Sequence, residues 1–396
     1  MQSFEFLMPT HIIFGECTEQ RCGELVKAYG GSRVLVVYGG ESARKSGLID
    51  RIAQSLQDAG LAYELLGGVH PNPTLSFAQK GVEQSVHFGA DFLLAVGGGS
   101  VIDCAKAIAD GSPTPEYPLW DYWSRQRPLT QALPVGVVLT IPAAGSESSD
   151  SAVLTNDTTM VKRGLNSPLH RPRFAILNPT LTYTLPPFQI ACGIVDMMMH
   201  TMDRYFNPIC TNQLTDEIAE GLLRTVITNG KIAIENRAEP HAMSELMWAG
   251  SVSHNGLTGL GNQTDFAPHQ LSHELSAKYD VAHGAALSSI WSSWARFTMD
   301  TNPERFAQFG TKVWGIDGTG KTAVQTATEA IDTTEAFFSS LHMPVSIPQL
   351  PCGKLPDDIL EELATRCTYY GTRTIGSFRV LGHNEILAIY TMANKT

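Results

Sequence analysis

The sequence predicts an α/β domain with a parallel sheet, followed by an all-helical domain. Three observations support this prediction. Up to about residue 185, short β-branched runs alternate with amphipathic stretches, which is typical of parallel strands joined by crossover helices. After Pro186 and Pro187, strand patterns nearly disappear and helical periodicity takes over. The chain has 396 residues, more than one hydrophobic core usually supports, so we predict domains at 1–185 and 186–396.

Four apolar runs in the first domain have the length and composition of buried strands. Glycine or proline follows each run closely, and these residues end strands in turns. Residues 46–59 have the apolar spacing of a helix, as expected for a crossover connection. The four runs are 33–38 (RVLVVY), 91–96 (DFLLAV), 135–141 (VGVVLTI) and 174–177 (FAIL).

Five segments of the second domain repeat apolar residues at helical spacing. Thr215, followed by Asp216 and Glu217, predicts the start of one of these helices. A hydroxyl can accept a hydrogen bond from the first turn, and carboxylates favour the positive end of the helix dipole. The five segments are 188–205, 215–234, 241–252, 266–279 and 283–299.

The composition is that of an ordinary globular protein, with 43% hydrophobic and 17% charged residues. A formal net charge of -11 without any Lys/Arg run argues against binding to nucleic acid or to an anionic membrane. The N-terminal segment lacks a basic region before an apolar core, and no apolar run approaches the ~20 residues that span a bilayer. Seven cysteines without a CxxC pair suit free thiols in a reducing compartment. We therefore expect a cytoplasmic protein.

A run of three glycines and a serine joins a predicted strand to a predicted helix. Without Cβ atoms, Gly97, Gly98 and Gly99 let the backbone approach a pyrophosphate, and a helix beginning at Ser100 offers unpaired N–H groups. Ser100 and Asp103 also have the spacing of a capping box. The run is not the GxGxxG fingerprint, and a tight capped turn without a ligand would use the same residues. A second turn upstream favours the dinucleotide interpretation.

The second turn follows the strand at 33–38, where an α/β nucleotide domain contacts the adenosine ribose. An acidic residue at the strand end would accept hydrogen bonds from both ribose hydroxyls and repel a 2′-phosphate. Gly39 occupies that point and basic side chains follow it, so we favour NADP(H) over NAD(H). Glu41 opposes this preference, because its carboxylate would repel the phosphate. The residues expected around the ribose are Gly39, Gly40, Ser42, Arg44 and Lys45.

Acidic and imidazole side chains recur at helical spacing in the second domain. Asp196 and His200 are four residues apart, so both side chains leave one face of a helix. His269 and His273 repeat this spacing, and His283 stands at the start of another predicted helix. A single histidine is more often a surface or hydrogen-bonded residue than a ligand. Five such residues on three helices favour a mixed O/N site for Fe(II) or Zn(II) with an open position for a substrate.

The pocket around such an ion is expected to be apolar. Phe188, Trp248, Phe266 and Trp291 occur near the candidate ligands in the sequence, although each could equally belong to the core. No cluster of arginine or lysine accompanies them to hold a carboxylate or a phosphate. We interpret His254 as structural or pocket-lining. An uncharged substrate therefore fits better than an anionic one.

Seven segments in a fixed order give the chain an end-to-end similarity to a known family. They are PTHIIFG (9–15), VVYGGESARKSG (36–47), AVGGGSVIDCAK (95–106), LTIPAAGSES (139–148), LNPTLTYTLPP (177–187), GIVDMMMHTMDRYF (193–206) and HQLSHEL through AHG (269–284). With them the chain resembles the iron-containing alcohol dehydrogenase family, in its butanol dehydrogenase-like, NADP-linked aldehyde reductase branch. The resemblance implies a dinucleotide-binding N-terminal domain, a helical metal-binding C-terminal domain and an active-site cleft between them, the dehydroquinate synthase-like architecture.

Several site residues follow from the resemblance, position by position. Gly97 to Ser100 match the pyrophosphate turn, and Asp103 matches a catalytic residue expected near the nicotinamide. Thr140 and Ser146 would line the cofactor groove, and Lys162 would contact the cofactor. The metal ligands would be Asp196, His200, His269 and His283, with His273 as a proton relay.

Three positions depart from the family pattern. Ala144 stands where threonine is usual, Asn178 where aspartate is usual, and Glu41 where this branch usually has glycine. The first two changes remove polar groups at the groove and leave the assignment intact. The third is the feature that opposes NADP(H).

The predicted reaction is hydride transfer between NAD(P)H and a small alcohol or aldehyde, with the metal acting as a Lewis acid on the substrate oxygen. We also expect a homodimer. Alternatives of the same architecture are a glycerol dehydrogenase-like or a dehydroquinate synthase-like enzyme. From other classes, a metal-dependent hydrolase or a non-enzymatic binding module would use similar residues, although the nucleotide-type turns disfavour the hydrolase.

Overall fold

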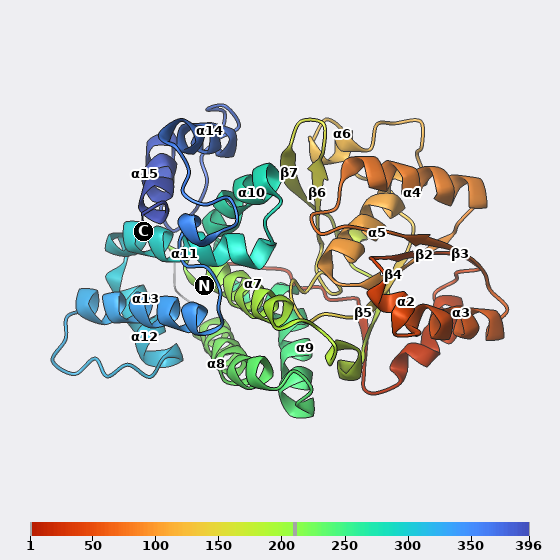
Figure 1. Cartoon of the computed structure of the whole chain (residues 1–396), viewed down its shortest axis with the longest axis horizontal. Coiled ribbons are helices and arrows are strands. Elements are labelled where there is room, and N and C mark those ends of the chain that lie inside the picture. Colours follow the sequence, from red (N-terminus) through yellow and green to blue (C-terminus); the bar gives the residue numbers. More distant parts are fainter. Residues whose placement is uncertain (1, 209–211, 396) are drawn as a thin grey trace. The chain divides into compact units, whose positions relative to one another are not determined.

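The structure is a computed structural model that describes residues 2–208 and 212–395 (Figure 1). Contacts between Cα atoms group the chain into two compact units. The α/β unit comprises Leu7–Leu185 and Ala238–Ser251, and the helical unit comprises Met1–Phe6, Pro186–Arg237 and Val252–Thr396. The segment Ala238–Ser251 follows residue 185 in the sequence but belongs to the α/β unit, so one boundary in the sequence cannot separate the two units. The domain boundary near residue 185 stays a prediction.

A six-stranded parallel sheet forms the centre of the α/β unit, with the strand order β1-β8-β5-β4-β2-β3. The four strands expected from apolar runs are present as β2, β4, β5 and β8, with ends within two residues of the expected ones. The outermost strands β1 and β3 and an antiparallel hairpin of β6 and β7 were not predicted. The strands are β1 (His11–Phe14), β2 (Arg33–Tyr38), β3 (Ala62–Gly67), β4 (Phe92–Gly97), β5 (Val135–Leu139), β6 (Ser151–Asn156), β7 (Val161–Asn166) and β8 (Phe174–Leu177).

Helices pack on both faces of this sheet. Helices α4 (Leu75–Phe88) and α5 (Gly99–Gly111) share a buried core with Val37 of β2. Helices α1 (Cys22–Ala28) and α3 (Leu48–Asp58) share another with the adjacent Val36. Successive residues of a strand point to opposite faces, so a strand buried on both sides is apolar throughout. The unit also contains the single turns α2 (Ser42–Lys45) and α6 (Trp120–Trp123).

Helices dominate the C-terminal half, and the five helices expected there are present as α7 to α11 with ends within two residues of the expected ones. The start of α8 differs from its prediction, because Asn212, not Thr215, is the N-cap and accepts a hydrogen bond from the Thr215 N–H at 3.4 Å. Together with the parallel sheet, these helices confirm the predicted fold class. The helices are α7 (Pro187–Tyr205), α8 (Gln213–Glu235), α9 (Pro240–His254), α10 (Ala267–Tyr279), α11 (His283–Thr298), α12 (Pro303–Val313), α13 (Ala323–Ser340), α14 (Asp357–Cys367) and α15 (His383–Ala393).

Among the helices of the described residues, none combines the length and the apolar character that crossing a bilayer requires.

Candidate metal centre and cofactor site

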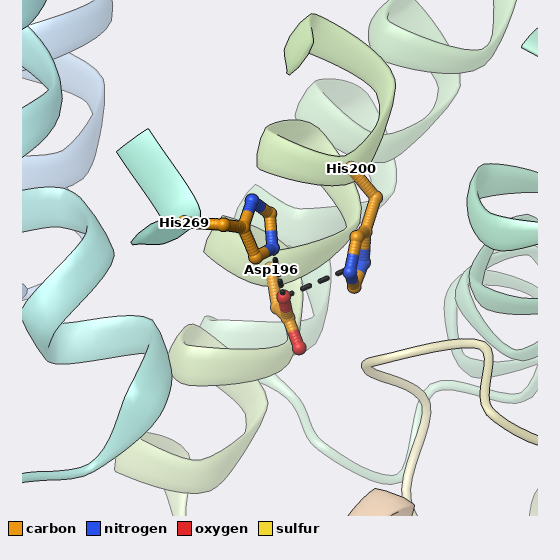
Figure 2. A group of neighbouring side chains, drawn as sticks. All are labelled: Asp196, His200 and His269. Carbon is orange, nitrogen blue, oxygen red and sulfur yellow. Dashed lines mark ion pairs between the residues drawn. The ribbon is translucent and has the colours of Figure 1, made fainter. Parts of the chain in front are cut away.

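Helix α7 presents the first two candidate metal ligands. Asp196 and His200 stand one turn apart, and His200 Nδ1 lies 3.4 Å from Asp196 Oδ1. Helix α10 brings His269, whose Nε2 lies 3.6 Å from the same carboxylate oxygen. Figure 2 shows the two imidazoles converging on Asp196 from different helices. The structure therefore brings three of the predicted ligands into one group.

The ligand atoms of this group are buried and face one another. One ligand atom from each of the three residues lies within 4.8 Å of the others. Asp196 Oδ1, His200 Nδ1 and His269 Nε2 make no hydrogen bond within the described part of the chain. Buried polar atoms without partners are costly, and a divalent cation between these three would satisfy all of them. The group fits Fe(II) or Zn(II), which accept mixed carboxylate and imidazole ligands.

The fourth candidate ligand, His283, is the first residue of α11 and lies beside the group of three. Its Nε2 is 3.8 Å from Asp196 Oδ1, and its ring centroid is 5.4 Å from that of His269. Gly284 permits this approach, because a Cβ atom there would lie 2.5 Å from the carbonyl oxygen of Cys192 on α7. The start of α11 can therefore sit against α7 just before Asp196.

His273 and the aromatic side chains take different positions around the ligands. The His273 ring centroid lies 5.6 Å from that of His283 and 6.4 Å from that of His269, next to the candidate ligands but outside their group. Phe266 lies 5.4 Å from the His269 ring. Trp291 is fully buried and packs on other aromatic rings, so it belongs to the core. Phe188 and Trp248 are about half exposed.

Burial and neighbouring charges shift the pKa values of two candidate ligands in opposite directions. Burial, assisted by nearby histidines, holds the pKa of His200 well below its ordinary value. For His269, burial lowers the pKa, but Asp203 and Asp196 together outweigh burial and raise it to about 9. The His200 imidazole is therefore neutral with a lone pair available, whereas His269 must give up a proton to bind a metal ion.

Two further residues lie beside the candidate ligands: Asp203, which was not predicted as part of the site, and His254, which was interpreted from the sequence as structural or pocket-lining. Asp203 is fully buried and accepts a hydrogen bond from His269 Nδ1 at 2.5 Å. His254, at the end of α9, sets its ring edge-on to that of His200, with centroids 3.8 Å apart. A sequence signal for Asp203 existed, because it stands seven residues after Asp196 and so shares its face of the helix.

Three loops that contain predicted cofactor contacts meet at one edge of the parallel sheet. They follow β2, β4 and β5, which are neighbours in the sheet. The strand order reverses between β2 and β4, since β3 lies outside β2 and β5 lies outside β4. Open α/β sheets bind ligands at the carboxyl ends of strands at such a switch point. Gly39, Gly97 and Thr140 stand at these strand ends, and the Thr140 N–H donates to the Gly97 carbonyl at 3.1 Å.

The glycine turn after β4 packs closely against the loop that follows β5. A Cβ atom on Gly98 would lie 2.1 Å from Ile141 Cγ2. Helix α5 begins at Gly99 with Gly98 as its N-cap, and no side chain caps it. The predicted capping box of Ser100 and Asp103 is therefore wrong, since both residues fall inside the helix. The Val101 and Ile102 N–H groups donate to the Gly98 carbonyl at 3.0 and 3.1 Å, and because no side chain caps the helix, the N–H groups of Gly99 and Ser100 are the ones that can face an anion.

Asp103 and Ser146, predicted as separate cofactor contacts, bond to each other. Ser146 Oγ donates to Asp103 Oδ1 at 2.6 Å, and the Val153 N–H donates to Asp103 Oδ2 at 3.0 Å. The fully buried Lys106 donates to Ser146 Oγ at 2.9 Å and to the backbone carbonyls of Ser146, Ser149 and Ser151, the last being the first residue of β6. Burial raises the pKa of Asp103 and lowers that of Lys106 to about 8. This network, in which Lys106 was not predicted, ties the loop after β5 to α5.

Neutral side chains anchor two of the three basic residues expected near the cofactor. Lys162 Nζ donates to Asn72 Oδ1 at 2.8 Å, and Arg44 Nε donates to the Tyr38 hydroxyl at 2.7 Å. The Tyr38 ring requires glycine on the neighbouring strand, because a Cβ atom on Gly67 would lie 2.3 Å from it. The remaining ribose candidates follow β2 on the surface, and Gly40, Ser42 and Lys45 are exposed.

Comparison with known proteins decides the family. The model described as iron-containing alcohol dehydrogenase matches residues 9–179, and that of the Fe-containing alcohol dehydrogenase family, C-terminal, matches residues 190–394. This chain belongs to the iron-containing alcohol dehydrogenase family.

Individual members of the family are similar over most or nearly all of the chain. NADH-dependent butanol dehydrogenase A of Clostridium acetobutylicum is 39% identical, over 98% of this chain and 99% of that protein. The NADPH-dependent aldehyde reductase YqhD of Escherichia coli is 35% identical, over 88% of this chain and 89% of its own. The crystal structure of NADH-dependent butanol dehydrogenase A from Thermotoga maritima matches with a TM-score of 0.95 at 32% identity, covering 100% of this chain and 99% of that one.

Family membership establishes the reaction class. The chain is an oxidoreductase of the alcohol dehydrogenase and aldehyde reductase type, with a metal and a nicotinamide cofactor. The hydrolase and the non-enzymatic binding module considered above are therefore excluded.

Two departures from the family pattern have a local structural role in this chain. Asn178 Oδ1 accepts a hydrogen bond from the Thr180 N–H at 3.1 Å, and its amide donates to Glu19 Oε2 at 2.8 Å, so it caps the turn after β8. Ala144 packs against the glycine turn, where a Cβ atom on Gly99 would lie 3.0 Å from its methyl group.

Proposed function

We propose that this chain reduces short, unbranched, uncharged aldehydes with NADP(H) at a metal ion held by Asp196, His200, His269 and His283. The observation that supports the proposal best is the group of buried ligand atoms from α7 and α10 that face one another without hydrogen-bond partners in the described part of the chain. The relatives of this chain include a butanol dehydrogenase and an aldehyde reductase by name.

The proposed ion is Fe(II) or Zn(II), and when bound it would act as a Lewis acid on the substrate oxygen. The chain's own contribution is to hold one carboxylate and the neutral His200 in a buried setting that excludes water. His273, which lies next to His283, is proposed to move the substrate proton. Asp103 is proposed to act near the nicotinamide, holding Ser146 in place through the hydrogen bond between them.

The preference for NADP(H) rests on the residues after β2. Gly39 leaves the strand end without a carboxylate, and Arg44 keeps both terminal nitrogens available to a 2′-phosphate while its Nε is anchored by Tyr38. The relatives divide on this point, since the Clostridium butanol dehydrogenase is named for NADH and the Escherichia reductase for NADPH.

A single assay tests the main proposal. Metal-loaded enzyme is mixed with butanal and either coenzyme, and the absorbance at 340 nm is followed. We expect butanal to be reduced with a lower KM for NADPH than for NADH. Saturation at a lower concentration of NADH would overturn the coenzyme preference, and no oxidation of either coenzyme over a panel of short aldehydes would overturn the substrate class.

The proposed ligands lead to a prediction about metal content. Purified protein should contain about one divalent metal per chain, and His269→Ala should lose it, because one imidazole is missing from the coordination shell. Elemental analysis of both proteins measures this directly. As a control, His241→Ala changes a histidine of α9 outside the group of candidate ligands and should retain the metal. Full metal content in His269→Ala would contradict the assignment.

A homodimer in the cytoplasm completes the proposal. Light scattering on the purified protein tests the first point, because a mass near twice that of the 43.0 kDa chain is expected. Cell fractionation tests the second.

A further inference from the structure

We propose that Asp203 is a positioning residue that holds the His269 ring in the orientation and tautomer that metal binding requires. The inference rests on the proposed metal centre, because it concerns a residue that supports one of the proposed ligands without being one. Asp203 has no place among the ligands inferred from the sequence.

The geometry of the His269 ring supports this role. Its Nδ1 donates to Asp203 Oδ2 at 2.5 Å, while its Nε2 lies 3.6 Å from Asp196 Oδ1. A hydrogen bond at Nδ1 fixes the proton there and leaves the Nε2 lone pair for the metal. Two carboxylates of the same helix thus face the two nitrogens of one imidazole, since Asp203 accepts the hydrogen bond from Nδ1 and Asp196 lies opposite Nε2.

Helix α7 sets both carboxylates at fixed positions. Asp196, His200 and Asp203 follow one another at spacings of four and three residues, so all three side chains lie along one face. A shift of α7 would therefore move two ligands and the support of the third together.

Burial strengthens the interaction between the Asp203 carboxylate and the His269 imidazole. The side chain of Asp203 is fully buried, and its Oδ1 makes no hydrogen bond within the described part of the chain. A buried carboxylate is costly unless it is paired, and here the hydrogen bond to the imidazole provides the pairing. A carboxylate bonded to the far nitrogen also raises the basicity of a metal-bound imidazole.

The backbone of Asp203 also binds the segment that leads into α10, the helix that carries His269. Its carbonyl accepts a hydrogen bond from the Asp265 N–H at 2.8 Å, in the loop that leads into α10. The Asp265 carboxylate in turn accepts the Ala267 N–H at 2.8 Å and the N–H groups of Ser377 and Phe378 at 2.7 and 2.8 Å. Asp203 therefore fixes both the His269 ring and the chain that precedes it.

Binding of Co(II) to metal-free protein tests the proposal. The visible absorption of Co(II) reports both affinity and coordination, and it needs neither substrate nor coenzyme. We compare wild type with Asp203→Ala, which removes the hydrogen bond, and Asp203→Asn, which keeps the shape. Glu220→Gln is the matched control, because it removes another fully buried carboxylate of the helical unit, one that bonds Tyr205 and Gln308 instead of a candidate ligand.

We expect Asp203→Ala to weaken Co(II) binding by roughly ten- to a hundredfold and to change the spectrum. Asp203→Asn should recover part of the affinity, and Glu220→Gln should bind as wild type. Wild-type affinity in both Asp203 variants, or an equal loss in Glu220→Gln, would overturn the positioning role while leaving the metal centre standing. Wild-type protein that binds no Co(II) would overturn the metal centre itself. If Asp203→Ala does not fold, Asp203→Leu replaces it, since leucine has a similar size but accepts no hydrogen bond from His269 Nδ1, and wild-type Co(II) affinity and spectrum in Asp203→Leu would overturn the proposal.

Discussion

Glu41 is the acidic side chain that follows the end of β2, where Gly39, Ser42 and Arg44 would otherwise favour a 2′-phosphate. Two exposed charges a few ångströms apart repel by about 1 kcal/mol in water. Glu41→Gly should therefore strengthen NADPH binding about fivefold and leave NADH binding nearly unchanged. Fluorescence titration with each coenzyme measures both constants. Equal changes for the two coenzymes would mean that Glu41 does not face the ribose.

Asp265 gives the helical unit a pH-dependent stability. Burial, with a smaller effect of Asp203, raises its pKa from 3.8 to about 6. The folded state then binds the extra proton between these values, so this contribution is fully present below pH 3.8 and is lost as the pH rises through about 6. At about 1.4 kcal/mol per pKa unit, the loss is about 3 kcal/mol.

The variant Asp265→Asn isolates this effect, because the amide does not titrate while most of the shape is kept. Urea unfolding of both proteins at pH 4.5 and at pH 7 gives the two differences in the free energy of unfolding. We expect wild type to lose stability relative to Asp265→Asn as the pH rises. A difference that is the same at both pH values would show that Asp265 is ionised in the folded state throughout.

Among the strands of the sheet, those that could be predicted from the sequence are the ones that are buried along all or nearly all of their length. Strand β4 is buried along its whole length, so its apolar run could be recognised. Strand β3 (AYELLG) is the edge strand and is only partly buried, so Glu64 and Tyr63 interrupt any apolar run. Strand β1 (HIIF) is the other edge strand, and its end residues His11 and Phe14 are exposed, whereas β8, of the same length, is buried throughout.

The residues of the candidate site also differ in whether the sequence could predict their contacts. Residues at helical spacing, such as Asp196 and His200, could be proposed because a helix fixes their relation. The bond between Asp103 and Ser146 could not, because 43 residues separate them and only the packing of the loop after β5 on α5 brings them together.

The turn from β4 into α5 gives a prediction about one element. Gly98→Ala would place a methyl group 2.1 Å from Ile141 Cγ2, so the turn must move. We expect a loss of stability of roughly 1 to 3 kcal/mol and weaker binding of both coenzymes, measured by urea unfolding and by fluorescence titration.

Two further variants test whether the contact with Ile141 causes these losses. Gly98→Ala combined with Ile141→Ala should recover part of the coenzyme affinity, because the clashing group is gone. Gly164→Ala, in the hairpin strand β7, meets its nearest atom only at 3.9 Å and should leave coenzyme binding unchanged. No recovery in the double variant would show that the contact with Ile141 is not the reason for glycine at this position.

For the whole molecule, the two units contribute different chemistry. All candidate metal ligands and Asp203 belong to the helical unit, and all candidate coenzyme contacts belong to the α/β unit. Arg204 is the basic residue beside His200, but its Nη1 donates to the backbone carbonyls of His200 at 2.6 Å and Ser253 at 3.3 Å, and its guanidinium lies over the Phe266 ring.

Because Arg204 is bonded to the backbone in this way, its guanidinium is not positioned to clamp an anionic substrate, and we expect uncharged aldehydes to be preferred. We expect kcat/KM for butanal to exceed that for a carboxylated or phosphorylated aldehyde of similar length, measured with metal-loaded enzyme at saturating NADPH. A methylene group in an apolar pocket contributes only roughly 1 to 3 kcal/mol, so neighbouring chain lengths should all react. An anionic aldehyde that exceeds butanal tenfold, equivalent to about 1.4 kcal/mol in transition-state binding, would require Arg204 to leave its carbonyl partners and bind the substrate.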